Sequence, residues 1–385
     1  MKIVFICGSL QPGCDGVGDY SRRLASELIF KGVDVMLIAI HDNYINETIV
    51  GTQKIENVAV DVVRIPAELS NKPKFEIVKK YIDDFNPDWL SLQYVPFSFH
   101  AKGIHYGLSN MLKMIGENKQ WHVMVHELWV GIRETYNPSM LVMHVLQKKL
   151  ITQLIHDLKP QVIHSHLPLN KVRLERYGLR ISKLPLFSNI EVENKDSIKK
   201  IGKKFKVGFF SQMDINGPII KFLQVLKNEI EEVGMEIQLV FIGASNKQIL
   251  CLSEKLKNVI YLKNKVKFIG FLQPNKLSNA LKTCSLGITP VPRHVLGKSG
   301  SVAAFMTHGI PVAAPVVSPG YTPEDLGFYS SGLCSSIVTK PDLECFNEAF
   351  KNVQVAKKEI QIDIIAAIFI SDLQAAVDFN SRNIC

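Results

Sequence analysis

The 385-residue sequence lacks several features that would assign it to an obvious class. It has no run of about 18 uninterrupted apolar residues, which excludes an ordinary membrane-spanning helix. Its seven cysteines are odd in number and show no paired spacing, so we expect reduced thiols in a cytoplasmic protein. No Cys/His cluster has zinc spacing, and we predict no metal: His164 and His166 could face one way on a strand, but no thiol or carboxylate nearby completes a site.

The composition is that of a soluble globular protein long enough for two domains, with 46% hydrophobic and 21% charged residues. The net charge is +9, from 45 Lys and Arg against 36 Asp and Glu. A basic surface is compatible with a phosphorylated substrate or with peripheral contact to anionic lipid, and equally with plain solvation. The sequence has no recognisable nucleic-acid module and no aromatic residues interleaved with the basic ones, so we predict no nucleic-acid partner.

Buried strands and amphipathic helices alternate along both halves of the chain. Met1–Ser9 is predicted to be a first strand and not a signal peptide, a glycine-containing loop follows, a helix starts near Tyr20, and Val33–Ile40 is the next strand. Such βαβ units imply parallel sheets. A lysine-rich segment, 189–206, separates the halves, and KVGFFS restarts the rhythm.

We therefore predict an α/β protein with two doubly wound Rossmann-like domains that face each other across a cleft. The first covers residues 1–190 and the second residues 204–359, and a last helix of about 360–385 is compatible with packing back on the first domain. In such sheets ligands bind outside the carboxyl ends of the strands.

The stretch from Pro290 to Pro315 combines a buried strand, a small-residue turn at 297–301, a helix from Val302 to His308 and a second buried strand. Backbone N–H groups at the positive end of a helix dipole bind anions, and a lysine in the turn adds a full charge. We predict that the turn binds the diphosphate of an activated sugar; the alternative is an ordinary βα turn. The candidate residues are Lys298, Ser299, Gly300 and Ser301.

The chain resembles a glycosyltransferase of the B-type fold (GT-B) and is most similar to the retaining enzymes of glycosyltransferase family four. The resemblance covers nearly the whole chain and rests on KIVFICGSLQPGCDGVGDYSRRLASEL, VMVHELW and GITPVPRHVLGKSGSVAAFMTHGIPVAAPVVSPGYTPEDL. The family's glycine loop before a helix matches Gly16, Val17 and Gly18, and its strand ending in His plus an acidic residue matches His126 and Glu127.

The resemblance implies roles for these residues. Gly16, Val17 and Gly18 would close on the donor diphosphate, and His126 would contact the sugar or the acceptor. Asp19 and Glu127 are candidate acceptor-side carboxylates, and Gln93 is a candidate acceptor contact. Alone, a histidine after VMV is more often a hydrogen-bonded core residue, and the glycines of such a loop often only shape a βα turn.

The sequence departs from the family where the donor binds. Leu296 and Ala304 stand at the positions of the family's two glutamates, and neither side chain accepts a hydrogen bond. Uncharged Gln212 and Asn216 stand near the family's diphosphate-binding Arg and Lys. We expect Lys298, helped by Arg293 or His294, to replace part of the missing charge.

The resemblance implies a glycosyltransferase that uses a nucleotide-diphosphate sugar as co-substrate, without a cofactor. The acceptor would be a saccharide, a lipid-linked sugar or another glycoconjugate, and the reaction retaining and metal-independent, in polysaccharide or glycoconjugate biosynthesis. We expect a cytoplasmic protein, or one bound peripherally to the inner face of the membrane, with His126 and Lys298 as catalytic residues. Two alternatives stay open: a nucleotide-sugar epimerase, and a non-catalytic partner subunit with a glycosyltransferase fold.

Overall fold

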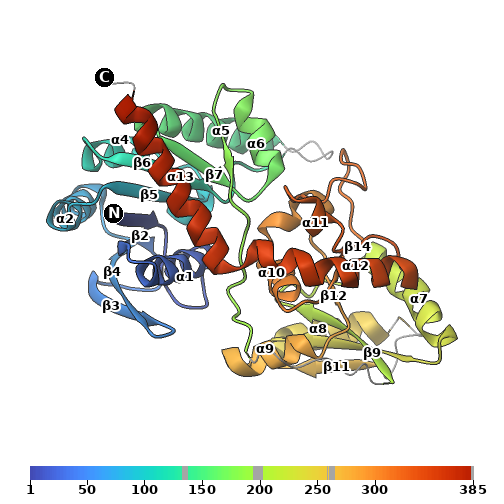
Figure 1. Ribbon diagram of the computed structural model, residues 1–385. Coiled ribbons are helices and arrows are strands. Elements are labelled where there is room, and N and C mark those ends of the chain that lie inside the picture. Colours follow the sequence, from blue (N-terminus) through green and yellow to red (C-terminus); the bar gives the residue numbers. More distant parts are fainter. Residues whose placement is uncertain (132–137, 194–202, 258, 260–264, 383–385) are drawn as a thin grey trace. The chain divides into compact units, whose positions relative to one another are not determined.

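A computed structural model describes residues 1–131, 138–193, 203–257, 259 and 265–382 (Figure 1). The chain divides into two compact units. The first unit holds Met1–His166, Asn170–Leu184 and the segment from Ala366 onward, and the second holds Leu167–Leu169 and Pro185–Ile365. Part of the lysine-rich segment that was read as a linker, residues 194–202, lies outside the described residues.

The first unit is built on an 8-stranded sheet in the order β3-β4-β2-β1-β5-β6-β7-β8. Its described strand pairs are parallel except the pair of β3 with β4, which is antiparallel. The strands are β1 (Lys2–Cys7), β2 (Asp34–Asp42), β3 (Ile49–Ile55), β4 (Val58–Pro66), β5 (Trp89–Tyr94), β6 (Gln120–Val125), β7 (Val162–Ser165) and β8 (Ser182–Lys183).

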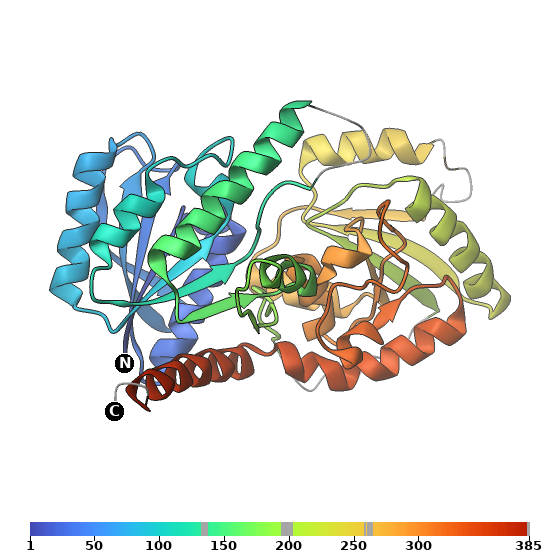
Figure 2. The ribbon, with the colours of Figure 1, turned by 90° about the horizontal axis from the view of Figure 1, so that it is seen from above.

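Helices cover both faces of this sheet, which explains why its central strands are continuous apolar runs. On one face a core forms between the strands and the helices α2, α4 and α5. On the other face lie α1, which contacts β1 and β2, and α13 (Figure 2). The Phe369 ring of α13 stacks on the Phe5 ring of β1. The helices that accompany this sheet are α1 (Gly16–Phe30), α2 (Asn71–Phe85), α3 (Pro96–Phe99), α4 (Leu108–Ile115), α5 (Pro138–Leu158), α6 (Pro168–Glu175) and α13 (Ile362–Arg382).

The second unit has a 6-stranded parallel sheet in the order β11-β10-β9-β12-β13-β14. Its strands are β9 (Lys204–Phe210), β10 (Glu236–Ile242), β11 (Val266–Ile269), β12 (Leu286–Ile288), β13 (Val312–Ala313) and β14 (Ile337–Val338). The helices are α7 (Gly217–Glu232), α8 (Asn246–Lys257), α9 (Pro274–Lys282), the 3-10 helix η2 (Arg293–Lys298), α10 (Gly300–Thr307), α11 (Ser331–Cys334), α12 (Leu343–Ala356) and the 3-10 helix η3 (Lys357–Ile360).

Two glycines let α10 lie close to this sheet. A Cβ on Gly287 of β12 would come within 2.5 Å of the Phe305 ring, and one on Gly208 of β9 within 2.6 Å of the Cys284 sulfur. Because both strands have a glycine at this point, the fully buried Phe305 side chain can occupy the space that a side chain would otherwise take.

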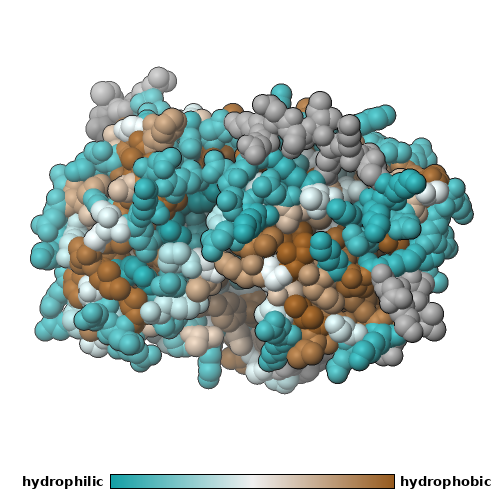
Figure 3. All heavy atoms as spheres, turned by 90° about the horizontal axis from the view of Figure 1, so that it is seen from below, coloured by the Kyte–Doolittle hydropathy of each residue, from teal (hydrophilic) through white to brown (hydrophobic). Residues whose placement is uncertain are grey.

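The predicted α/β class with two parallel-sheet, Rossmann-like domains is confirmed. In the described part of the chain no single helix is long and apolar enough to cross a membrane. On the face drawn in Figure 3 hydrophilic side chains predominate, and apolar ones gather in separate patches among them.

Candidate functional site

A buried ion pair between Asp42 and Arg64 supports the turn between β1 and α1. Asp42, at the end of β2, is fully buried, and its carboxylate accepts hydrogen bonds from Ser9 Oγ at 3.1 Å, Leu10 N at 3.2 Å and Arg64 Nε at 2.7 Å. Burial alone would raise the pKa of Asp42, but these hydrogen bonds and the charge of Arg64 outweigh it and lower the pKa. Arg64 also donates to Gln11 Oε1 at 2.8 Å, so one guanidinium anchors the start of the turn, directly at Gln11 and through Asp42 at Ser9 and Leu10.

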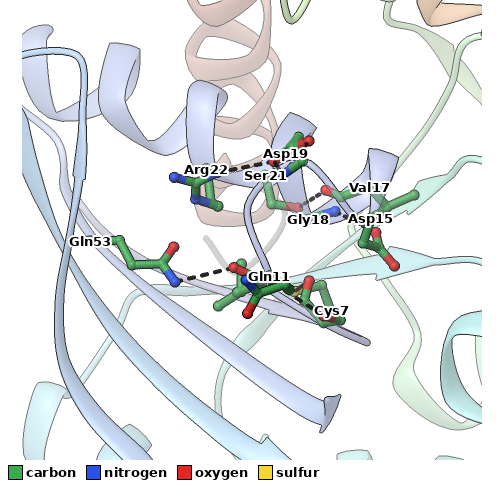
Figure 4. Close-up of polar contacts among 12 residues, drawn as sticks. Cys7, Gln11, Asp15, Val17, Gly18, Asp19, Ser21, Arg22 and Gln53 are labelled. Atoms are coloured by element: carbon green, nitrogen blue, oxygen red, sulfur yellow. Dashed lines mark hydrogen bonds and ion pairs between the residues drawn. The ribbon is translucent and has the colours of Figure 1, made fainter. Parts of the chain in front are cut away.

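Figure 4 shows the start of α1, where Asp15 caps the helix. The Asp15 carboxylate accepts from Gly18 N at 2.7 Å, and the Asp19 carboxylate accepts from Gly13 N and from Arg22 Nη1. The helix therefore begins at Gly16, and the prediction of a start near Tyr20 was wrong because Asp15 supplies the N-cap.

Gly16, Val17 and Gly18 thus form the first turn of α1 and do not lie in a loop. A Cβ on Gly18 would come within 2.4 Å of the Ser9 carbonyl oxygen, so this glycine is required by the packing of helix against turn, whereas nothing lies within 4 Å of a Cβ on Gly16. Diphosphate binding by these residues stays a prediction. The structure places the Asp15 carboxylate at the same helix N-terminus, and one anion there disfavours a second.

A continuous chain of buried hydrogen bonds crosses β5, β6, β7 and the residues just after them; we call it the histidine chain. Six buried side chains, each 7% exposed or less, link a backbone carbonyl to the Asp372 carboxylate, which is 36% exposed. The seven hydrogen bonds measure between 2.7 and 3.2 Å. In order it runs from the Leu184 carbonyl oxygen through His166, His126, Gln93, Ser91, His122 and His164 to the Asp372 carboxylate of α13.

A fully hydrogen-bonded histidine chain requires one proton more than its neutral side chains supply. Both ends are acceptors, so the seven hydrogen bonds need seven protons. Four neutral imidazoles, one hydroxyl and one amide N–H provide six. The missing proton lies between two acceptors, the Leu184 carbonyl oxygen and Gln93 Oε1, so a fully bonded chain places the imidazolium charge on His126 or His166. Burial lowers the pKa of His166 to about 4 and that of His122 well below its ordinary value, which disfavours the charge on those two rings.

Two of the predicted contact residues, His126 and Gln93, belong to the histidine chain and are buried in it. His126 is 7% exposed, and its ring nitrogens contact Gln93 and His166, which is the arrangement of a hydrogen-bonded core histidine. Gln93 is fully buried between Ser91 and His126, so its side chain is not accessible in this structure; the acceptor contact stays a prediction. Glu127 is half-buried and, with Asp19, is the more accessible of the predicted acceptor-side residues.

In the second unit the predicted turn residues gather at the start of α10. Ser299 is the N-cap and accepts from Val302 N, and its hydroxyl lies 3.1 Å from that of Ser301. Gly300 is exposed, with nothing within 4 Å of a Cβ on it, and Lys298 is half-buried at the end of η2. The helix begins two residues earlier than the predicted Val302, because Ser299 caps it.

Leu296 and Ala304, at the positions of the family's glutamates, are 1% and 0% exposed and belong to the apolar core between α10 and the sheet. Asn216 caps α7 by accepting from Ile219 N at 3.2 Å. These positions therefore hold packing and capping residues, as the sequence indicates.

Arg293 has a structural role that the sequence did not predict. Its Nε, Nη1 and Nη2 donate to the carbonyl oxygens of Ala314, Pro323 and Thr339 at 2.7, 2.8 and 2.8 Å. The guanidinium thus ties together the segments that follow β13 and β14, and burial lowers its pKa. Two of its five N–H donors are not used by these bonds.

Arg293 also lines a cavity of about 460 Å³ at the carboxyl ends of β13 and β14, beside the N-terminus of α7. Lys221 brings a second cation to its wall. Of the predicted diphosphate-binding residues only Arg293 lines this cavity; Lys298, Ser299, Gly300 and Ser301 do not. No group of three or more His, Cys, Asp or Glu in the described ranges could hold a metal ion.

Comparison with known proteins shows the fold. The sequence matches no protein-family model and no curated protein. Among solved structures, the HepE protein of Anabaena, in complex with UDP and glucose, superposes with a TM-score of 0.56 at 14% identity, over 97% of this chain and 100% of that one. An α,α-trehalose-phosphate synthase (UDP-forming) of Burkholderia vietnamiensis gives a TM-score of 0.58 at 10% identity, over 98% and 99% of the two chains.

A putative UDP-N-acetylglucosamine 2-epimerase of Listeria monocytogenes gives a TM-score of 0.53 at 11% identity, over 98% of this chain and 96% of that one. These neighbours confirm the GT-B fold that the resemblance implied. At such identities they carry no statement about this chain's donor or acceptor.

Proposed function

We propose that the chain is a glycosyltransferase that moves a sugar from a nucleotide-diphosphate donor to a saccharide, lipid-linked or other glycoconjugate acceptor. The observation that carries the proposal is the GT-B fold together with a cavity of about 460 Å³ at the carboxyl edge of the second sheet, whose wall holds Arg293 and Lys221. Ligands of doubly wound sheets bind at this edge, and clustered cations suit a nucleoside diphosphate. The UDP and glucose in the HepE complex agree with this donor class.

The chemistry requires that negative charge be stabilised on the departing diphosphate. Preorganised N–H groups and cations usually supply the largest share of such catalysis. Within the cavity we assign this task to Lys221 and to the N–H donors of Arg293 that its three carbonyl contacts do not use. Lys298 and the N–H groups at the start of α10, which do not line the cavity, are assigned the same task on the sequence pattern. His126 acts as a positioning residue within the histidine chain, because its ring nitrogens already contact chain members.

We further propose a retaining, metal-independent reaction in the cytoplasm, with acceptor contacts from the first unit. In retaining enzymes of this type the departing phosphate itself can deprotonate the acceptor, so no protein base is required. The acceptor-side candidates that stay accessible are Asp19 and Glu127.

A sugar-epimerase activity is the second candidate, because a putative UDP-N-acetylglucosamine 2-epimerase has the same fold along 98% of this chain. A non-catalytic partner subunit is the third, favoured by the burial of Leu296 and Ala304 where glutamates are usual. The three proposals differ in what happens to a bound donor.

The test is incubation of the protein with a panel of UDP-, GDP-, ADP- and dTDP-sugars, with and without acceptors. A transferase releases nucleoside diphosphate slowly by hydrolysis and faster with its acceptor. An epimerase instead converts the sugar, which NMR detects, and a partner subunit leaves every donor unchanged. We expect Lys298→Ala to lower turnover roughly 10-fold or more, as loss of one charge-assisted contact does; unchanged donor binding and turnover in this variant would refute the assignment of Lys298.

A further inference from the structure

A second cavity, in the first unit, has no role in the function proposed so far. It measures about 350 Å³ and lies where β2 and β4 end and α2 and α4 begin. Its apolar wall includes Leu69, Phe99 and Met111, and its polar wall includes His41, Lys74 and His100. No described residue of its lining carries a carboxylate. A cavity with cation-forming groups on one wall and apolar groups on another suits an anionic ligand with a less polar body.

Lys74 is the unusual member of this wall. It is 6% exposed, and the one hydrogen bond described for its ammonium goes to the Ala67 carbonyl oxygen at a long 3.4 Å. No Asp or Glu of the described ranges forms an ion pair with it. Arg64 of β4, another buried cation of the first unit, forms an ion pair with Asp42. A buried cation without a counter-charge is costly to keep, and a bound anion would supply that counter-charge.

Two further features point donors into the same cavity. His100 Nδ1 accepts from Lys102 N and Ile104 N, so in the neutral ring the proton is on Nε2, which is then a donor. Helices α2 and α4 both start at the cavity, and neither has a side-chain cap. The Leu108 N–H of α4 already donates to the His105 carbonyl oxygen at 3.4 Å, and Pro73 of α2 has no N–H, so an anion could use only the remaining first-turn N–H groups and the positive dipole ends.

Charged groups around Lys74 agree with this polarity. His41 is half-buried beside it, and burial together with the charges of Lys74 and His100 lowers the His41 pKa. The exposed carboxylate of Glu68 raises the pKa of Lys74. Burial lowers that pKa by more, so the pKa of Lys74 lies below its ordinary value. The cavity therefore has an excess of positive potential at the point where Lys74 lies.

We propose that this cavity binds a phosphate group, with Lys74, His100 Nε2 and the N–H groups of the two helix N-termini as its donors. Several donors around one cavity suit the three free oxygens of a phosphate monoester. If the proposed function holds, this ligand is the acceptor, which makes the acceptor a phosphate-bearing molecule: a sugar phosphate or a phospholipid-linked sugar. Only that last step rests on the proposed function.

The experiment measures phosphate binding without any nucleotide sugar. Glucose 6-phosphate, glucose and inorganic phosphate are titrated into the full chain by calorimetry, and co-sedimentation is measured with phosphatidylglycerol and phosphatidylcholine vesicles. The variants are Lys74→Met and, as a control on the same helix, Lys80→Met, whose side chain is exposed. His100→Gln, at an exposed position, serves as a second variant that leaves the core intact.

We expect the wild type and Lys80→Met to bind glucose 6-phosphate, or anionic vesicles, and not glucose. Lys74→Met should weaken this binding roughly 10- to 100-fold, as loss of a hydrogen bond to a charged group does, and it should melt at the same temperature as the wild type or higher, since it removes a buried unpaired charge. His100→Gln should weaken it less. Binding of the sugar phosphate identifies a soluble acceptor, and binding of phosphatidylglycerol vesicles alone identifies a lipid-linked one; both support the phosphate site.

Absence of binding to all phosphate probes, or equal binding by Lys74→Met, overturns the proposal. A marked loss of thermal stability in Lys74→Met, with binding unchanged in His100→Gln, also overturns it, because Lys74 is then a structural residue. Failure of the proposed function gives a different result: phosphate binding persists, and no nucleotide sugar is turned over with any acceptor.

Discussion

Replacement of Arg293 by lysine separates a structural role from a purely ligand-binding one. The lysine keeps the positive charge at the cavity but, with a single nitrogen, reaches at most one of the three carbonyl oxygens that Arg293 contacts at 2.7 to 2.8 Å. Two backbone acceptors, on segments that follow β13 and β14, then lose their partner.

The expected cost follows from those two acceptors. A buried acceptor left without a partner costs about 1–3 kcal/mol. Because the cavity beside Arg293 admits water to part of this region, we take the lower half of that range for each and expect Arg293→Lys to lower the free energy of unfolding by about 2–4 kcal/mol. A residue that only awaits a diphosphate would cost well under about 1 kcal/mol.

The assay must report on the second unit. The tryptophans, Trp89, Trp121 and Trp129, all belong to the first unit, so their fluorescence follows the wrong part of the chain. Urea unfolding by circular dichroism gives the midpoint, and amide hydrogen exchange of peptides covering residues 312–340 locates the change. Lys221→Met, an exposed cation of the same cavity, is the control and should leave both unchanged. An unchanged midpoint and unchanged exchange in Arg293→Lys would refute the structural role.

Two more predictions follow from the first unit. Gly18→Ala places a methyl group 2.4 Å from the Ser9 carbonyl oxygen, so it should lower the free energy of unfolding by about 1–3 kcal/mol, measured by urea unfolding; a neutral result would mean that the turn moves freely. His105 and His166 have a pKa of about 4 in the folded protein against about 6.5 when unfolded, so the unfolded state binds more protons between these two values. The free energy of unfolding should therefore fall as the pH falls from 6.5 to 4, by about 1.4 kcal/mol per pH unit for each histidine. A free energy of unfolding that stays constant over this range would contradict the prediction.

The sequence was sufficient for the framework because the framework depends on local patterns. Continuous apolar runs such as IVFIC and LVFI are buried strands, and their alternation with helices implies two parallel sheets. The helix starts were displaced where a cap was overlooked: Asp15 before Gly16, and Ser299 before Gly300. An Asp or Ser directly before the first helical residue was the signal that could have placed both.

The sites were harder to predict because they depend on which segments converge. Lys74 and Arg293 look like ordinary surface cations in the sequence, and only the fold shows that each is buried. The histidine chain depends on the register between β6 and β7, which pairs Met124 with His164, and no local pattern fixes that register. The spacing of His164 and His166 indicated a shared direction but not their partners.

Isothermal titration calorimetry with UDP, other nucleoside diphosphates and their sugars asks whether the second unit binds an activated sugar. We predict saturable binding of one nucleotide class, with a dissociation constant between roughly 1 µM and 1 mM, as is common for enzyme substrates. Lys298→Ala should weaken that binding at least about 10-fold. No heat of binding with any nucleoside diphosphate or nucleotide sugar at millimolar concentration would contradict the proposed function.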